Sequence, residues 1–156
     1  MRIRERRAED LPALEAVLAE QQPSSGYPHH WPLPFPVRDF LVRRTEQCAW
    51  VAEDGDRLVG HVAVARPDES VHEAFAAALG THDLGELIAL FVAVEVRGSG
   101  VGGRLIDTAV EWIRTAGQVP VLDLLGRDTR AHRVYLHRGW VEIGEIGPLL
   151  LMALTD

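Results

Sequence analysis

A cluster of glycines between an apolar segment and an amphipathic segment is the feature that most limits how this chain can fold. Four of the six residues from 98 to 103 are glycine. The eight residues from Leu87 to Val94 form an apolar run with the length of a buried strand. After the cluster, Ile106, Val110 and Ile113 repeat with the spacing of one helix face. The sequence therefore predicts a strand, a glycine loop and a helix in succession.

This arrangement suits the binding of a phosphate group. Glycine allows the backbone to approach an anion closely and to direct successive N–H groups at it. The helix that follows adds unpaired N–H groups and the positive end of its dipole. We therefore expect the loop from Gly98 to Gly103, with Arg97 before it, to bind a phosphate or pyrophosphate.

Two other kinds of phosphate-binding loop fit the chain less well. The pattern Gly98-x-Gly100-x-x-Gly103 matches a dinucleotide fingerprint as text, and Asp123 resembles the acid that binds the ribose. That fingerprint usually follows the first strand of a large doubly wound sheet, whereas several strands are predicted before this loop. A Walker loop requires a lysine, and the chain contains none.

Hydrophobic patterning and turn signals predict one α/β domain, residues 1–156, with a mixed sheet. A proline-rich stretch, residues 23–36, is expected to be irregular because proline disrupts regular structure. We expect strands at 1–7, 48–53, 58–66, 86–96, 119–125, 140–146 and 149–154. We expect helices after Asp10, at 37–45, from the glycine loop to about 116 and at 128–138, with 71–79 as a further candidate.

Composition limits the classes of partner. The chain has 16 basic and 23 acidic residues, for a formal net charge of −7. This acidic balance argues against binding of nucleic acids or anionic membranes, because such binding requires a basic surface. No apolar run reaches the roughly 18–20 residues of a membrane span. The single cysteine, Cys48, has no internal disulfide partner, so we expect a soluble, cytoplasmic protein.

Two motifs give the chain a family resemblance. Arg97-x-x-Gly100-x-Gly102 fits the pattern Arg/Gln-x-x-Gly-x-Gly/Ala, and the segment Asp128-x-x-Ala-x-x-x-Tyr135-x-x-x-Gly-Trp140 fits Asn-x-x-Ala…Tyr…Gly-Phe. At these residues the chain resembles the GNAT superfamily of N-acetyltransferases. The order of the predicted elements is also similar to the GNAT fold. The resemblance implies a central, mixed, mostly antiparallel sheet of about seven strands, flanked by about four helices.

The resemblance also implies acetyl-CoA as the acyl-donor cosubstrate. Asp128 stands where the family usually has Asn. Asp128 can still accept a hydrogen bond, and we expect Arg127, Arg130 and Arg133 to offset its negative charge. The backbone of Leu90, Phe91 and Val92 would pair with the pantetheine arm, and the pyrophosphate would be wrapped by Arg97, Gly98, Ser99, Gly100, Val101, Gly102 and Gly103.

An amine can attack a thioester directly, so such an enzyme mainly has to align its two substrates. A backbone N–H near Val92 is the candidate donor to the thioester carbonyl. Tyr135 matches the family residue that protonates the departing thiolate. Glu86 is the favoured base, with Asp123 or a water chain as alternatives. No metal site is expected, because no pair of His or Cys residues has metal-ligand spacing.

The sequence leaves the acceptor open. The leading hypothesis is an amine of a small molecule. The alternatives are a protein acceptor, at a Lys or an N-terminus, and a non-catalytic acyl-CoA-binding module. Residues 27–35, rich in proline and aromatic side chains, would wall the site of an apolar acceptor, unless Trp31 and Phe35 pack into the core instead. Dimers are common in the family, and the closing strands are the expected interface of a homodimer.

Overall fold

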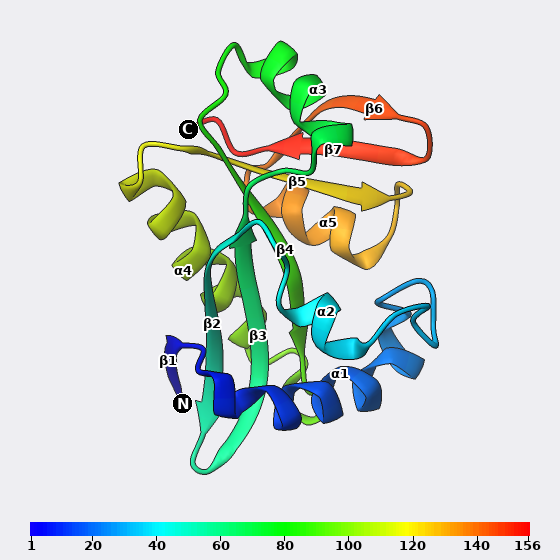
Figure 1. Cartoon of the computed structure of the whole chain (residues 1–156), viewed down its shortest axis with the longest axis vertical. Helices are drawn as coiled ribbons and strands as arrows, with labels where there is room; N and C mark the ends of the chain where they lie inside the picture. Colours follow the sequence, from blue (N-terminus) through cyan, green and yellow to red (C-terminus); the bar gives the residue numbers. More distant parts are fainter. The chain divides into compact units, whose positions relative to one another are not determined.

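The computed structural model describes all 156 residues, which form seven strands and five α-helices (Figure 1). The strands are β1 (Arg2–Glu5), β2 (Glu46–Asp54), β3 (Arg57–Ala65), β4 (Leu84–Val92), β5 (Val119–Leu125), β6 (Val141–Ile146) and β7 (Leu149–Ala153). The helices are α1 (Leu11–Ser25), α2 (Val37–Leu41), α3 (Glu69–Leu79), α4 (Val101–Thr115) and α5 (Arg130–His137), with short 3-10 turns η1 (Ala8–Asp10) and η2 (Val94–Val96).

The strands form one sheet in the order β1-β2-β3-β4-β5-β7-β6. The pairs β1–β2, β2–β3, β5–β7 and β7–β6 are antiparallel. The pair β4–β5 is parallel, with Leu84 beside Val119 and Glu86 beside Val121. Parallel neighbours need a long crossover connection, and α4 lies in that connection. The predicted mixed, mostly antiparallel sheet of seven strands is thus confirmed.

The chain divides into two compact units. The first unit contains residues 1–65 and 88–109, and the second contains residues 66–87 and 110–156. Strand β4 and helix α4 each contribute residues to both units. No helix has the length and apolar character that crossing a membrane would require.

In the first unit, helix α1 packs against β3 through an apolar face that includes the fully buried Leu14 and Leu18. The helix continues to Ser25, so the expected break at Pro23 is wrong by about one turn. Pro23 has no N–H to donate to the Ala19 carbonyl, so the last turn of the helix continues with one hydrogen bond fewer. Gly26 then ends the helix in the left-handed conformation, with its N–H 2.8 Å from the Gln22 carbonyl oxygen.

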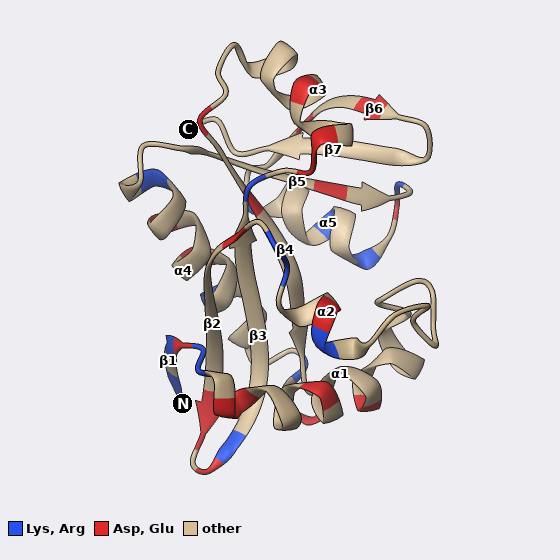
Figure 2. Ribbon diagram, in the orientation of Figure 1, with Lys and Arg blue, Asp and Glu red and all other residues tan.

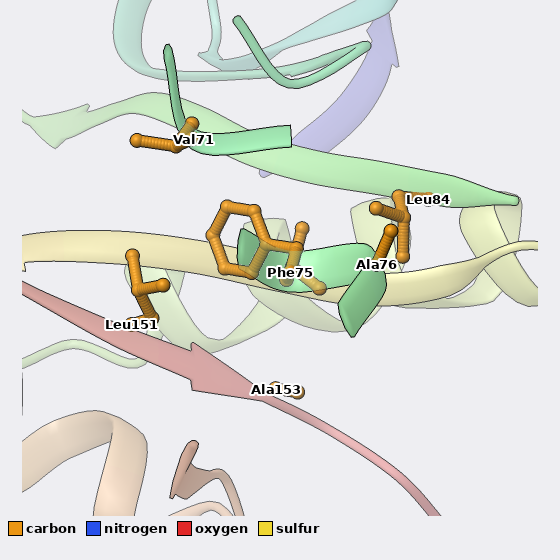
Figure 3. Packing of buried hydrophobic residues seen from close by; sticks show 7 residues of the cluster. Val71, Phe75, Ala76, Leu84, Leu151 and Ala153 are labelled. Carbon is orange, nitrogen blue, oxygen red and sulfur yellow. The ribbon is translucent and has the colours of Figure 1, made fainter. Parts of the chain in front are cut away.

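In the second unit, the candidate helix at 71–79 is present as part of α3. Its buried face packs on the sheet, with Phe75 fully buried at the centre of an apolar cluster (Figure 3). The cluster consists of Val71, Phe75 and Ala76 from α3 together with Leu84, Val121, Leu151 and Ala153 from the strands.

Two further predicted ends, those of β4 and α2, were wrong. Strand β4 stops at Val92 rather than 96, because the chain turns into η2, where the Val96 N–H donates to the Ala93 carbonyl at 3.2 Å. Helix α2 stops at Leu41 rather than 45, since Val42 is already in an extended conformation.

Candidate functional site

The glycine loop connects β4 to α4 in the first unit. Gly98 has φ 83° and Gly100 has φ 92°, a backbone region that residues with a side chain rarely adopt. A Cβ atom placed on either residue would meet no heavy atom within 4 Å. Glycine is therefore required here for the backbone conformation, and the hydrogens of both residues face open space. An anion can approach the loop backbone from that space.

The N-terminus of α4 lies directly after these two glycines. Helix α4 begins at Val101, and the Arg104 N–H makes a helical bond to the Gly100 carbonyl at 3.1 Å. The N–H groups of the first helical turn point out of this end of the helix. Gly102 is in van der Waals range of β4, since a Cβ there would lie 3.8 Å from Val92 Cγ1. The structure thus places the predicted phosphate-binding backbone next to the predicted pantetheine-binding strand.

Arg97 and Ser99 are ordered by neighbours in the same unit. The Arg97 Nη2 group donates to Ser24 Oγ at 2.9 Å, which ties the loop to α1. The Ser99 N–H and hydroxyl both donate to the Val96 carbonyl. The loop is therefore held in shape by its own hydrogen bonds before any ligand binds.

Strand β4 contains an unusual backbone conformation. Ala89 has φ 51°, and Ala89 and Asp128 are the two non-glycine residues with positive φ. Such a conformation costs roughly 1–2 kcal/mol for a residue with a Cβ and persists only where the surroundings impose it. The next residues alternate in exposure. Phe91 is buried, whereas Leu90 and Val92 are half-buried.

A buried histidine contacts this strained residue. His61 lies in β3 and is fully buried, with its Nδ1 atom 2.8 Å from the Ala89 carbonyl oxygen. Its Nε2 atom lies 3.0 Å from Arg6 Nη1, and both carboxylate oxygens of Glu46 lie 2.7 Å from Arg6 Nη2. His61 was not among the residues predicted from the sequence. The available signal was a histidine inside the apolar run from Leu58 to Ala65.

The second unit carries the other candidate residues. Tyr135 of α5 is buried, and its ring contacts the Trp140 ring edge-on, with 5.4 Å between the ring centroids. Glu86 is buried, whereas Asp123 is half-buried. The register places Glu86 beside Val121, two residues before Asp123, so these side chains share one face of the sheet. The structure therefore brings the two candidate bases to the same face.

Asp128 differs from its predicted surroundings. Its N–H donates to His132 Nδ1 at 2.9 Å, and its carbonyl accepts from Arg133. Arg127 pairs with Glu142 and Glu145 rather than with the Asp128 carboxylate. Figure 2 shows basic residues on α5 and acidic residues on β6, both elements of this unit.

His132 completes this network. Its Nδ1 atom accepts from Asp128, so Nε2 carries the proton and donates to Glu142 Oε2 at 2.8 Å. Hydrogen bonds from Arg127 and from His132 lower the pKa of the Glu142 carboxyl. Thr129, whose hydroxyl accepts from the His132 N–H, caps α5 and makes it start at Arg130 rather than 128.

A third group of titratable side chains comes from the first half of α3 and from the segment that follows the helix. The ligand atoms of His72, Glu73 and His82 lie within 4.8 Å of one another, and His72 Nε2 is 3.2 Å from His82 Nδ1. The side chains of Glu73 and His82 are 81% and 69% exposed. Sequence spacing does not reveal this group, because the chain turns back between the two histidines.

The segment from Tyr27 to Phe35 is anchored to α1. The Gln21 side chain donates to the Tyr27 carbonyl at 2.6 Å. The Tyr27 ring contacts the Phe40 ring edge-on, with 5.6 Å between the ring centroids. Trp31 is half-buried, and Phe35 is 44% exposed. The alternative that Phe35 packs into the core is therefore wrong, and its ring is available at the surface.

The Acetyltransferase (GNAT) family matches residues 12–140 of the chain. No curated protein sequence matches it significantly.

Three solved structures share the fold over nearly their whole length. The PaiA N-acetyltransferase from Thermoplasma acidophilum, in complex with coenzyme A, is 14% identical, with a TM-score of 0.70 and 100% of both chains covered. The ribosomal-protein-S18-alanine N-acetyltransferase from Escherichia coli is 13% identical, with a TM-score of 0.69, covering 98% of this chain and 92% of that one. An aminoglycoside 6'-N-acetyltransferase complexed with coenzyme A is 18% identical, with a TM-score of 0.66, covering 100% and 98%.

The buried histidine predicts a specific loss of stability in acid. Burial, with the nearby Arg6 and Arg43 charges, lowers the pKa of His61 from 6.5 to about 4. Below pH 6.5 the unfolded chain binds a proton at this residue that the folded chain does not. Stability should fall by about 2 kcal/mol between pH 7 and pH 5, and by about 3 kcal/mol once pH 4 is passed.

Urea denaturation of the wild type and of His61→Leu at pH 7 and pH 5 checks this expectation. The variant lacks the titrating group, so its loss of stability over the same pH interval should be smaller by about 2 kcal/mol. Equal losses in the two proteins would contradict the assigned pKa.

Proposed function

The chain belongs to the acetyltransferase (GNAT) family, and we propose that it transfers the acetyl group of acetyl-CoA to an amine of a small molecule. Residues 1–156 act as one domain in this proposal, since the family match at 12–140 runs through both compact units. The observation that carries the proposal is the glycine loop at the N-terminus of α4, which fits a pyrophosphate.

The residues present fit the polyanionic part of acetyl-CoA. Gly98 and Gly100 face open space that a side chain would otherwise fill, and the first turn of α4 follows them. Backbone N–H groups at a helix N-terminus favour phosphate oxygens, and Arg97 adds a positive charge. In the proposal, residues 97–103 bind the pyrophosphate, and the backbone of Leu90, Phe91 and Val92 binds the pantetheine arm.

Acetyl-CoA would supply a thioester that an amine attacks directly. Tyr135, whose phenol is buried against Trp140, would give its proton to the sulfur as the C–S bond breaks. Glu86 would accept the proton that the attacking amine loses. Its burial supports this role, because a buried carboxylate is shielded from bulk water and holds a fixed position. Asp123, on the same face of the sheet, and a water chain are the alternatives.

The segment from Tyr27 to Phe35 would wall the acceptor side in this proposal. The exposed Phe35 ring, held on a short proline-rich backbone, suits the apolar part of a small amine. The solved structures of this fold include enzymes named for a protein and for an aminoglycoside acceptor, so the fold alone does not separate the two classes. A protein acceptor therefore stays the second candidate.

Two further parts of the proposal concern location and assembly. Cys48 is a free thiol, which supports a reducing compartment such as the cytoplasm. Strand β6 is the edge of the sheet, and most of its residues are exposed. An exposed edge strand can pair with a second copy of the same chain, so β6 is the proposed homodimer contact.

Release of free thiol from acetyl-CoA across a panel of small amines, peptides and proteins tests the function. We expect turnover with at least one small amine. Tyr135→Phe should lower kcat about 100-fold while the affinity for acetyl-CoA is kept, because the phenol acts on the leaving group. Binding of acetyl-CoA without turnover on any amine would favour a binding module, and turnover only on proteins would favour the second candidate.

The phosphate-binding loop is tested by Gly100→Val. A β-branched residue strongly disfavours φ 92°, so the loop should change shape and the affinity for acetyl-CoA should fall at least tenfold. Gly144→Ala is the matched control, since Gly144 lies outside the left-handed region and has open space around it. Isothermal titration measures both. Unchanged affinity in Gly100→Val would contradict the assignment of the loop.

Replacing each carboxylate by the corresponding amide distinguishes the two candidate bases, Glu86 and Asp123. Glu86→Gln should lower kcat at least tenfold and remove the fall in rate at low pH, because the group that must be deprotonated is gone. Asp123→Asn should leave that pH profile unchanged. The reverse pattern would assign the base to Asp123, and an unchanged profile in both would assign it to water.

A further inference from the structure

The hydrogen bond between His61 and Ala89 has a defined direction. An Arg guanidinium can only donate, so the His61 Nε2 atom beside Arg6 must be an acceptor. A neutral imidazole then carries its proton on Nδ1, which donates to the Ala89 carbonyl at 2.8 Å. Arg6 cannot turn away easily, because Glu46 and the Leu41 carbonyl also hold it. A chain of hydrogen bonds therefore runs from Glu46 through Arg6 and His61 to the Ala89 carbonyl of β4.

That carbonyl controls the direction of the next N–H group. In a trans peptide the C=O of one residue and the N–H of the next point in opposite directions within one plane. The Ala89 C=O points at His61, so the Leu90 N–H points away from it. The Phe91 ring stacks on the imidazole, with 5.3 Å between centroids and 22° between planes, and this contact limits rotation of the histidine.

The strained backbone makes this control necessary. Ala89 at φ 51° does not follow the regular pleat of β4, so the peptide after it is not oriented by strand geometry alone. The conformation costs free energy that the surroundings must offset. The fully buried His61 donates to the Ala89 carbonyl, and a buried hydrogen bond of this kind contributes to that offset.

We propose that His61 is a positioning residue for acetyl transfer: through the Ala89 carbonyl it directs the Leu90 N–H at the thioester carbonyl oxygen of acetyl-CoA. The inference rests on the proposed function, in which the β4 backbone from Leu90 to Val92 binds the pantetheine arm, whose sulfur carries the thioester. When the amine nitrogen bonds to the carbonyl carbon, negative charge develops on the carbonyl oxygen. A donor that is already oriented stabilises this charge without reorganising.

Two ligands that differ only in the carbonyl test the proposal without knowledge of the acceptor. S-ethyl-CoA is the thioether that lacks the carbonyl oxygen of acetyl-CoA. Wild type should bind acetyl-CoA more tightly than S-ethyl-CoA by roughly two- to tenfold, the usual contribution of one hydrogen bond. His61→Leu removes the imidazole N–H that donates to the Ala89 carbonyl, so the Leu90 N–H is no longer oriented and the affinities for the two ligands should become equal. His61→Asn places an amide N–H near the former Nδ1 position and should restore part of the preference.

A purely structural role for His61 would give another result. In that case His61→Leu would lower the affinity for both ligands equally or for neither, and the ratio of the two affinities would not change. Either result overturns the proposal while leaving the proposed function intact. Failure of the wild type to bind either ligand would instead contradict the proposed function. With an accepted amine, His61→Leu should lower kcat about 10- to 100-fold with little change in the KM for acetyl-CoA.

A measurement on the wild type covers the case in which the variants fail to fold. The Leu90 amide proton, followed by ¹⁵N-resolved NMR, should move downfield on adding acetyl-CoA and not on adding S-ethyl-CoA. The imidazole nitrogens of His61 should show the proton on Nδ1. An equal response of Leu90 to both ligands, or a proton on Nε2, would overturn the proposal.

Discussion

The parallel pairing of β4 with β5 is the constraint on which the candidate site depends. Two parallel neighbours must be joined by a crossover, and here that crossover contains α4. The carboxyl end of β4 is therefore followed by a turn and a helix N-terminus. The glycine loop makes that turn, with Gly98 and Gly100 in conformations that other residues avoid. Strand end, loop and helix dipole thus come together as a consequence of topology.

Buried polar contacts then hold the strand in its unusual form. His61 is fully buried, Arg6 and Glu46 are partly buried, and each meets a polar partner. The result is a fully buried imidazole that stays neutral and donates in one direction only. The chain carries a net charge of −7, yet Arg97 and the N–H groups of the glycine loop supply local positive charge at the place where we propose that the pyrophosphate binds.

The sequence predicted the parts of the fold that depend on local patterns. Apolar runs located the strands, and the glycine cluster located the turn between β4 and α4, because only glycine tolerates those φ values. The predicted ends of α1 and β4 were wrong. Helix α1 continues through Pro23, and β4 is ended by the turn η2, in which the Val96 N–H donates to the Ala93 carbonyl. His61 and Ala89 were missed because their contact joins residues 28 positions apart. The pairing of Arg127 with Glu142 is long-range in the same way.

The position of the cosubstrate is the central claim, and a crystal structure of the protein with acetyl-CoA bound tests it most directly. The account predicts pyrophosphate oxygens within hydrogen-bonding distance of the N–H groups of residues 98–103. It also predicts the thioester carbonyl oxygen about 3 Å from the Leu90 nitrogen. A pyrophosphate bound away from the glycine loop, or a carbonyl oxygen with no contact to β4, would contradict the account.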